Sequence, residues 1–189
     1  YTMPGVPSIY YGSEYAVEGK RTRDSDYDLR PCLDLNNVPN ANYQLCDHII
    51  KLGKVRLALE ALKYGKFENV NIMNEKLVYK RYTNNQTVFV LFNLTDHEER
   101  VGFDSRCNAK LTDVLNGNQV FDCNGWCELP VPAYSTRILV VNDGSFTVNL
   151  DSENGIYTVL MAYEGQQVEL KCKDKALVTD IDYGTDANQ

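Results

Sequence analysis

The sequence predicts an α+β protein in which one β-strand and one long amphipathic helix precede a mostly antiparallel β-sandwich. Three observations lead to this expectation. A short apolar segment between glycines opens the chain at residues 5–12, and helical periodicity follows over residues 43–62. From residue 66 the apolar residues instead alternate with a period of two, as in strands with one buried face.

The opening apolar segment, Val6–Tyr11, is too short for a helix and is rich in β-branched and aromatic residues, so we expect a strand. Gly12 then allows a sharp turn that presents Glu14 at the carboxyl end of the strand. In parallel α/β architectures ligand-binding groups collect at this end. Alternation along a strand would send Tyr10 and Tyr11 to opposite faces.

Residues 15–40 form a long polar stretch, and such a stretch in a compact domain is usually functional or disordered. Within it, Arg30 has two readings of equal weight. It forms an ion pair with Asp26, Asp28 or Asp34 that holds the loop, or it contacts a substrate.

The clearest helix covers Tyr43–Leu62, with Asn42 as its N-cap and Gly65 beyond its end. Gly53 inside the helix costs about 1 kcal/mol relative to alanine, so we expect it to mark close packing. One apolar stripe is formed by Leu45, Ile49, Leu52, Val55, Leu59 and Leu62.

Strands are predicted throughout the remainder of the chain. Residues 83–86 join the first two as a hairpin turn, and residues 116–117 form a second tight turn. Before residue 143 the expected strands are 76–82, 87–93, 98–103 and 109–114, with a closing segment at 128–141. Beyond it they are 146–150, 156–161, 167–170 and 176–182.

Charge and hydropathy exclude several classes of partner. The 189 residues carry a net charge of −7, and the lysines and arginines are scattered rather than gathered in the basic stripe that nucleic acid requires. No apolar run approaches the ~20 residues of a membrane span. We therefore expect neither nucleic acid nor a membrane as a partner.

The six cysteines are expected to be free buried thiols, with a Cys123–Cys127 bridge as the alternative in an exported protein. The compartment thus stays open, with the cytoplasm slightly favoured over secretion. Although residues 123–127 have a ligand-like spacing, no second Cys or His pair matches them, and the two histidines lie far apart. We expect no metal site and no cofactor.

The opening residues Gly5-Val6-Pro7-Ser8-Ile9-Tyr10-Tyr11-Gly12-Ser13-Glu14 resemble the motif on the eighth barrel strand of the α-amylase family of glycoside hydrolases, glycoside hydrolase family 13. The pair Arg30-Pro31 fits the loop that follows this strand. Four more phrases follow in the family's order, at residues 61–67, 90–95, 113–117 and 129–139. The resemblance covers residues 1–141.

This resemblance implies that residues 1–65 are the last β/α unit of a (β/α)8 barrel and that residues 66–143 are the β-sandwich behind it. Residues 144–189 are an additional β segment without an assigned role. It further implies a retaining enzyme acting on α-glucans such as starch, maltodextrin or cyclodextrin-like substrates, in which two carboxylates lie ~5–5.5 Å apart.

In that family the catalytic carboxylates lie on barrel strands four, five and seven, which would all precede Tyr1. The chain by itself is therefore expected to have no catalytic residue and no activity. Tyr11, Glu14 and Arg30 are the candidate substrate-binding residues that the resemblance and the strand position select.

The alternative function is a non-catalytic carbohydrate-binding or interaction β-module. Trp126 is the single tryptophan, so the sandwich lacks the row of exposed indoles that a dedicated sugar-binding surface uses. We also expect residues 66–141 to hold their own core, and residues 1–63 to be poorly ordered alone or covered by self-association.

Overall fold

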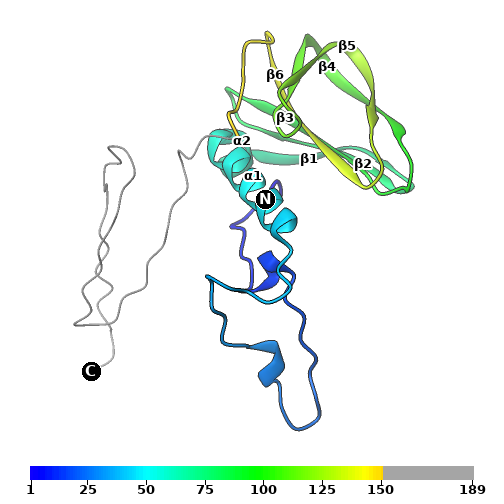
Figure 1. Cartoon of the computed structure of the whole chain (residues 1–189). Coiled ribbons are helices and arrows are strands. Elements are labelled where there is room, and N and C mark those ends of the chain that lie inside the picture. The colour runs from blue at the N-terminus through cyan, green and yellow to red at the C-terminus, as the bar shows by residue number, and fades with distance from the viewer. Residues whose placement is uncertain (151–189) are drawn as a thin grey trace, which may run out of the picture. The chain divides into compact units, whose positions relative to one another are not determined.

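The computed structural model of the chain describes residues 1–150, all of which belong to one compact unit (Figure 1). The strands expected after residue 150 lie outside the described residues. In chain order the elements are η1 Ser13–Tyr15, η2 Tyr27–Leu29, α1 Tyr43–Ala58, α2 Glu60–Tyr64, β1 Lys66–Met73, β2 Lys76–Tyr82, β3 Thr87–Asn93, β4 Glu99–Asp113, β5 Gln119–Val131 and β6 Ser135–Asn142. None of the helices in this part of the chain is long and apolar enough to cross a membrane.

The six strands form one antiparallel sheet in the order β1-β2-β3-β6-β4-β5, which confirms the expected antiparallel β-rich region. The hairpin β2–β3 has the predicted ends, with Lys76 opposite Asn93 and Tyr82 opposite Thr87. β1 was not predicted, because its polar residues and a register shift between Asn69 and Asn71 hide the alternation.

The central strands are buried on both faces. On β3, Val88 and Val90 pack against Leu59 and Leu62 of the helical region, whereas Phe89 and Leu91 point into a core that the strands build among themselves. Double burial explains why β3 and β6 consist of continuous apolar runs. The second core contains only residues between Val70 and Val141, so the expectation that residues 66–141 hold their own core is confirmed.

β4 and β5 form a long ribbon that folds across the sheet (Figure 1). Two strands were predicted at residues 98–103 and 109–114, but β4 runs through both, with a register shift between Asp104 and Asn108. Only the second half of β4 pairs with β6, and the first half approaches β1, where Asn71 Nδ2 donates to Gly102 O at 2.9 Å. The two layers of the sandwich thus belong to one curled sheet.

A disulfide between Cys123 and Cys127 closes the corner of this ribbon, with Cα atoms 5.7 Å apart. Four residues of straight strand would span ~13 Å, so β5 turns sharply here, with Gly125 at a φ of +74°. The Ser105 hydroxyl donates to Gly125 O at 2.8 Å and so ties β4 to the turn. The expectation of free thiols is therefore wrong for these two residues.

Three other cysteines are free as expected, although none is fully buried: Cys32 is exposed, and Cys46 and Cys107 are partly exposed. Cys172 lies outside the described residues.

The helical region begins as predicted, since Asn42 Oδ1 accepts a hydrogen bond from Leu45 N at 3.0 Å. The predicted single helix is interrupted at Leu59, which has an extended backbone with φ −108° and ψ 110°. This break lets Leu59, Ala61 and Leu62 all reach the core.

No strand forms at residues 6–11, so this part of the expected β/α unit is wrong for the structure as described. A barrel strand takes its hydrogen bonds from neighbours on both sides, and residues 1–150 provide no strand beside this segment. Val6 is 93% exposed as a result.

The predicted strand at residues 146–150 is also absent. The segment instead bonds to one side chain: Asn118 Oδ1 accepts from Val148 N, and Asn118 Nδ2 donates to Val148 O, both at 2.9 Å. A side-chain amide thereby takes the place of a paired strand, and Val148 is buried against the core.

Two arginines hold the first residues of the chain. Arg56 of α1 donates to the carbonyls of Tyr1, Met3 and Gly5, the first of them at 2.6 Å. Arg81 of β2 donates to Thr2 O at 2.8 Å and to Gly65 O at 2.9 Å.

A buried ion pair lies where β4 and β6 end their pairing. Arg137 Nη1 is 2.7 Å from Asp113 Oδ2, and the two side chains are 10% and 0% exposed. Asn116 Nδ2 also donates to Asp113 at 2.9 Å, and Arg137 Nε donates to Pro130 O at 2.6 Å. Two of the phrases recognised in the sequence, 113–117 and 129–139, therefore meet at this pair.

Replacing Asp113 by alanine should lower the free energy of unfolding by about 3–5 kcal/mol, because the buried guanidinium of Arg137 loses its carboxylate. Glu68→Gln is the matched control, since Glu68 pairs with Lys80 at the partly exposed surface and its loss should cost less than about 1 kcal/mol. Urea unfolding followed by circular dichroism measures both. Equal costs for the two variants would contradict a structural role for the buried pair.

Gly53→Ala should stabilise the chain by about 1 kcal/mol, because an added Cβ would meet only Tyr1 Cε1, at an ordinary 3.7 Å. The close packing expected at this glycine is thus wrong. Gly65→Ala should act in the opposite direction, because its Cβ would lie 2.3 Å from Ala61 O. Melting temperatures of the two variants check the signs, and a lowered value for Gly53→Ala would refute the reasoning.

His97 should titrate above its ordinary pKa of about 6.5. Hydrogen bonds to Asp96 Oδ1 at 2.8 Å and Glu99 Oε1 at 3.0 Å raise the pKa of its imidazole. Stability from the charged imidazole is therefore complete below the unfolded pKa and is lost as the pH rises through the folded one. An NMR titration should show Glu99→Gln lowering this pKa and the neighbouring Glu98→Gln leaving it in place; equal effects would contradict the bond.

Candidate functional site

The candidate site is a hollow of about 410 Å³ between the opening segment and the polar loop. Two of the three predicted substrate-binding residues, Tyr11 and Arg30, line it together. The rest of its lining is Tyr10, Ser13, Val17, Glu18, Gly19, Asp26, Asp28, Leu29 and Pro31.

A tight turn brings the two tyrosines to this hollow. Gly12, with φ +88°, is the N-cap residue that precedes η1, and Ser13 N donates to Tyr10 O at 3.0 Å. The rings of Tyr10 and Tyr11 lie 4.9 Å apart with a tilt of 42°. The expectation that they face opposite sides is wrong, because the backbone is already turning at Tyr10 and no pleated strand separates them.

Arg30 forms the ion pair that was one of its two readings, with Nη2 2.6 Å from Asp26 Oδ2. Its side chain remains 65% exposed, so the pair holds the guanidinium at the rim without covering it. The loop can fold back here because Gly19 lies against the Asp28 carbonyl, which a Cβ would approach to 2.2 Å.

Glu14 does not line the hollow. Its Oε2 atom is buried, and no hydrogen-bond partner for it exists within residues 1–150. Burial raises the pKa of the nearby Cys46 thiol, and the carboxylates of Asp47 and Glu14 raise it further, so this thiol is no activated nucleophile. The structure thus separates Glu14 from the other two predicted residues.

The hollow carries side chains of the kinds that contact polyhydroxylated ligands. Aromatic rings offer a stacking face, while the guanidinium and the carboxylates of Asp26 and Asp28 can bond to hydroxyls. Desolvation and the neighbouring Tyr10 raise the pKa of Tyr11, whose phenol therefore stays protonated and can donate. No group of three His, Cys, Asp or Glu side chains able to hold a metal ion occurs in the described part of the chain.

The sequence prediction selected Tyr11 and not Tyr10, because alternation allowed at most one of them into the site, and it named Asp26 only as a possible partner of Arg30; both Tyr10 and Asp26 line the hollow. Both were visible as residue types, but the signal that selects them is the turn at Gly12 and the folding back of the loop. Neither can be read from periodicity.

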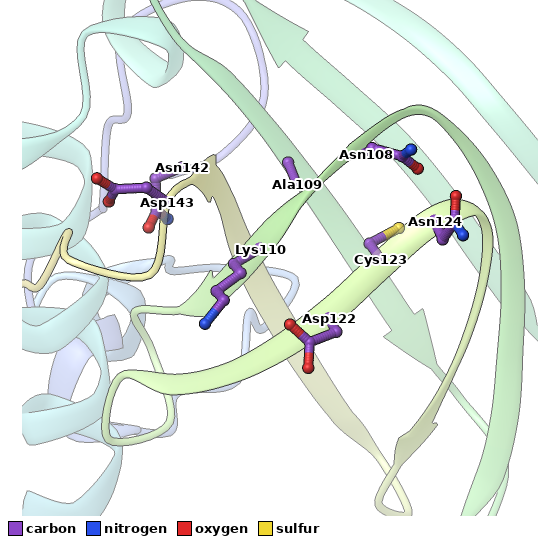
Figure 2. A pocket seen from close by; sticks show the side chains of 8 residues that line it. All are labelled: Asn108, Ala109, Lys110, Asp122, Cys123, Asn124, Asn142 and Asp143. Atoms are coloured by element: carbon purple, nitrogen blue, oxygen red, sulfur yellow. The ribbon is translucent and has the colours of Figure 1, made fainter.

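A second hollow, of about 630 Å³, opens beside the ribbon corner (Figure 2). Lys110 of β4 and Asp122 of β5 face each other in register, and Asn142 and Asp143 approach from the end of β6. The other lining residues are Asn108, Ala109, Cys123 and Asn124. Because this lining has no aromatic ring, it offers less to a sugar than the hollow at Tyr10 and Tyr11.

Comparison with known proteins finds similar sequences and similar folds, although no protein-family model matches the chain. It is 26% identical over 138 residues to "Alpha-amylase 3" of Dictyoglomus thermophilum, covering 60% of this chain and 27% of that protein. It is 34% identical over 128 residues to "Cyclomaltodextrin glucanotransferase" of a Bacillus species, covering 62% and 16%.

Among solved structures, the α-amylase of Geobacillus thermoleovorans complexed with acarbose superimposes with a TM-score of 0.65 at 24% identity. The match covers 75% of this chain and 31% of that one, and it concerns the fold. The chain spans about a quarter or less of the length of the two curated relatives named above. Sequence and fold agree with the motifs found at the start: the chain is similar to the C-terminal region of glycoside hydrolases of the α-amylase family.

Proposed function

We propose that this chain is the C-terminal part of a retaining glycoside hydrolase that acts on α-glucans. Names of the relatives, an α-amylase and a cyclomaltodextrin glucanotransferase, support this substrate class. The catalytic carboxylates then belong to a part of the enzyme outside this chain, and residues 1–189 alone are inactive. The role of the β-sandwich at residues 66–143, called the β-domain below, is to cover and stabilise the end of the barrel.

The observation that carries this proposal is the junction between the helical region and the sheet. Val55, Leu59 and Leu62 share one hydrophobic core with β2, β3 and β6. An independent binding module would need only its own core, which the β-domain has on its other face. The shared core instead favours a domain built onto the end of a barrel.

Within the proposed enzyme, Tyr11 and Arg30 form one wall of the substrate cleft, together with Tyr10. Stacking on the rings and hydrogen bonds from the guanidinium would orient a glucosyl unit. Glu14 lies outside this hollow, and we leave it without a role in substrate binding.

Tyr11→Ala and Arg30→Ala, made in the enzyme that contains this chain, should each lower kcat/KM on maltooligosaccharides roughly tenfold, the equivalent of about 1.4 kcal/mol of lost contact. Tyr64→Ala is the matched control, because this tyrosine is 80% exposed and lies outside the hollow. Equal kinetics for Tyr11→Ala and Tyr64→Ala would rule out a substrate contact at Tyr11.

The reaction class is tested by the first sugar released. A retaining enzyme acting on an α-linked substrate releases the α-anomer first, which proton NMR detects before mutarotation. Residues 1–189 alone should release no reducing sugar from soluble starch. A β-anomer from the whole enzyme, or hydrolysis by the isolated chain, would contradict the proposal.

A further inference from the structure

Trp126 is an exposed indole at the folded corner of the β4–β5 ribbon. It is 64% exposed and lies directly beside Cys127, whose disulfide to Cys123 closes the corner. Ser105 fixes the same turn through its bond to Gly125 O. The backbone that carries the indole is thus held on both sides, which reduces the entropy that a ligand would have to remove on binding.

Gly102 on β4 sets the position of the indole. A Cβ at this glycine would lie 2.7 Å from Trp126 Cζ2, so the ring occupies the space where β4 has no side chain. Covering a glycine in this way stabilises a sheet, but it uses only one side of the ring. The exposure of Trp126 shows that much of the ring remains open to solvent.

Charged residues lie near Trp126 in the register of the ribbon. Asp104 lies opposite Trp126 in the register of the ribbon. Arg100 Nε bonds to Glu128 Oε2 at 3.1 Å, and its Nη2 bonds to Glu128 O at 2.9 Å, with both side chains more than half exposed.

These surroundings favour a sugar over a protein partner. The core of a protein interface is depleted of charge and extends over many apolar side chains. A pyranose ring needs one aromatic face for its C–H groups and polar or charged donors and acceptors for its hydroxyls, and the ribbon carries both at Trp126 and its register neighbours.

We propose that Trp126, with Asp104, Arg100 and Glu128 around it, is a surface site for an α-glucan chain, separate from the hollow at Tyr11. The identity of the sugar rests on the proposed function, whereas the site rests on the geometry of the corner. One indole stacks on one or two glucosyl units, so the site binds in the millimolar range and holds the enzyme to a polymeric substrate.

The single tryptophan makes the test direct, because all indole emission from residues 1–189 comes from Trp126. Titration with maltoheptaose should give a saturable change in emission, and the β-linked cellohexaose should give none. This measurement needs no variant. An unchanged emission at tens of millimolar maltoheptaose overturns the proposal.

Retention in an amylopectin-containing native gel tests the residue. Trp126→Ala should weaken retention roughly tenfold, whereas Tyr134→Ala, which removes another aromatic ring that is 73% exposed, should retain the wild-type mobility shift. Urea midpoints of both variants check that each is folded. Equal retention of wild type and folded Trp126→Ala overturns the assignment.

The outcomes also separate the two proposals. If the whole enzyme hydrolyses soluble maltooligosaccharides while Trp126 emission does not respond, the surface site is refuted and the proposed function stands. If emission responds to cellohexaose and not to maltoheptaose, the α-glucan assignment of this site is refuted.

Discussion

The guanidinium of Arg81 is the point on which the arrangement of helices and sheet depends. It is 1% exposed, and burial together with the nearby Arg56 lowers its pKa. Removing a charge from water costs several kcal/mol unless polar groups replace the water. Here the replacements are carbonyls: those of Thr2 and Gly65 accept from its two terminal nitrogens. Because one carbonyl opens the chain and the other joins helix to sheet, the charge can be buried only while both segments stay in place.

The neighbouring contacts act on the same three segments. Tyr79, two residues before Arg81 on the same face of β2, shares a 2.6 Å hydrogen bond with Thr2 Oγ1 and packs on Phe67 at a ring distance of 5.0 Å. The helices cover this face with Val55 and Leu62, so polar and apolar contacts reinforce each other. A β-domain fastened in this way cannot move freely against the residues that precede it. This restriction suits a support for a barrel better than a tethered module.

The phrases that identify the family concern architecture rather than catalysis. Asn93, in the phrase at residues 90–95, is fully buried and donates to the carbonyls of His97, Val131 and Pro132, so it joins the loop after β3 to the end of β5. Asp113 and Arg137 form the buried pair described above. Each of these polar groups has partners on distant parts of the chain, and a substitution would leave several of them unsatisfied. The sequence could therefore reveal its relatives through residues that hold the fold together.

Local chemistry decided how much of the structure the sequence could predict. The hairpin β2–β3 and the cap at Asn42 were predictable, because each depends on residues a few positions apart. The segment at residues 6–11 was predicted as a strand from its composition. A strand forms only when neighbouring strands bond to it, and the periodicity of a segment does not reveal whether such neighbours exist. In the candidate site, the pairing of Arg30 with Asp26 is an i, i+4 contact and was among the alternatives. The meeting of Tyr10 with Tyr11 was not, because it follows from the turn at Gly12.

The corner of the β4–β5 ribbon also combines a contact that is local in the sequence with one that is not. Its disulfide joins residues four positions apart, so the bridge could be named from the sequence as the alternative to free thiols. The contact of Trp126 with Gly102 instead depends on the pairing of β4 with β5, which places Asp104 opposite Trp126 and Gly102 opposite Glu128 and which no pattern of apolar residues encodes. On composition alone, the single tryptophan argued against sugar binding, because a dedicated sugar-binding surface uses a row of exposed indoles. Geometry changes that argument, since one rigid ring with charged neighbours is sufficient for a weak site. A weak site is also what the proposed role requires, because any enzyme that moves along a polymeric substrate cannot be held tightly at a point away from the reaction.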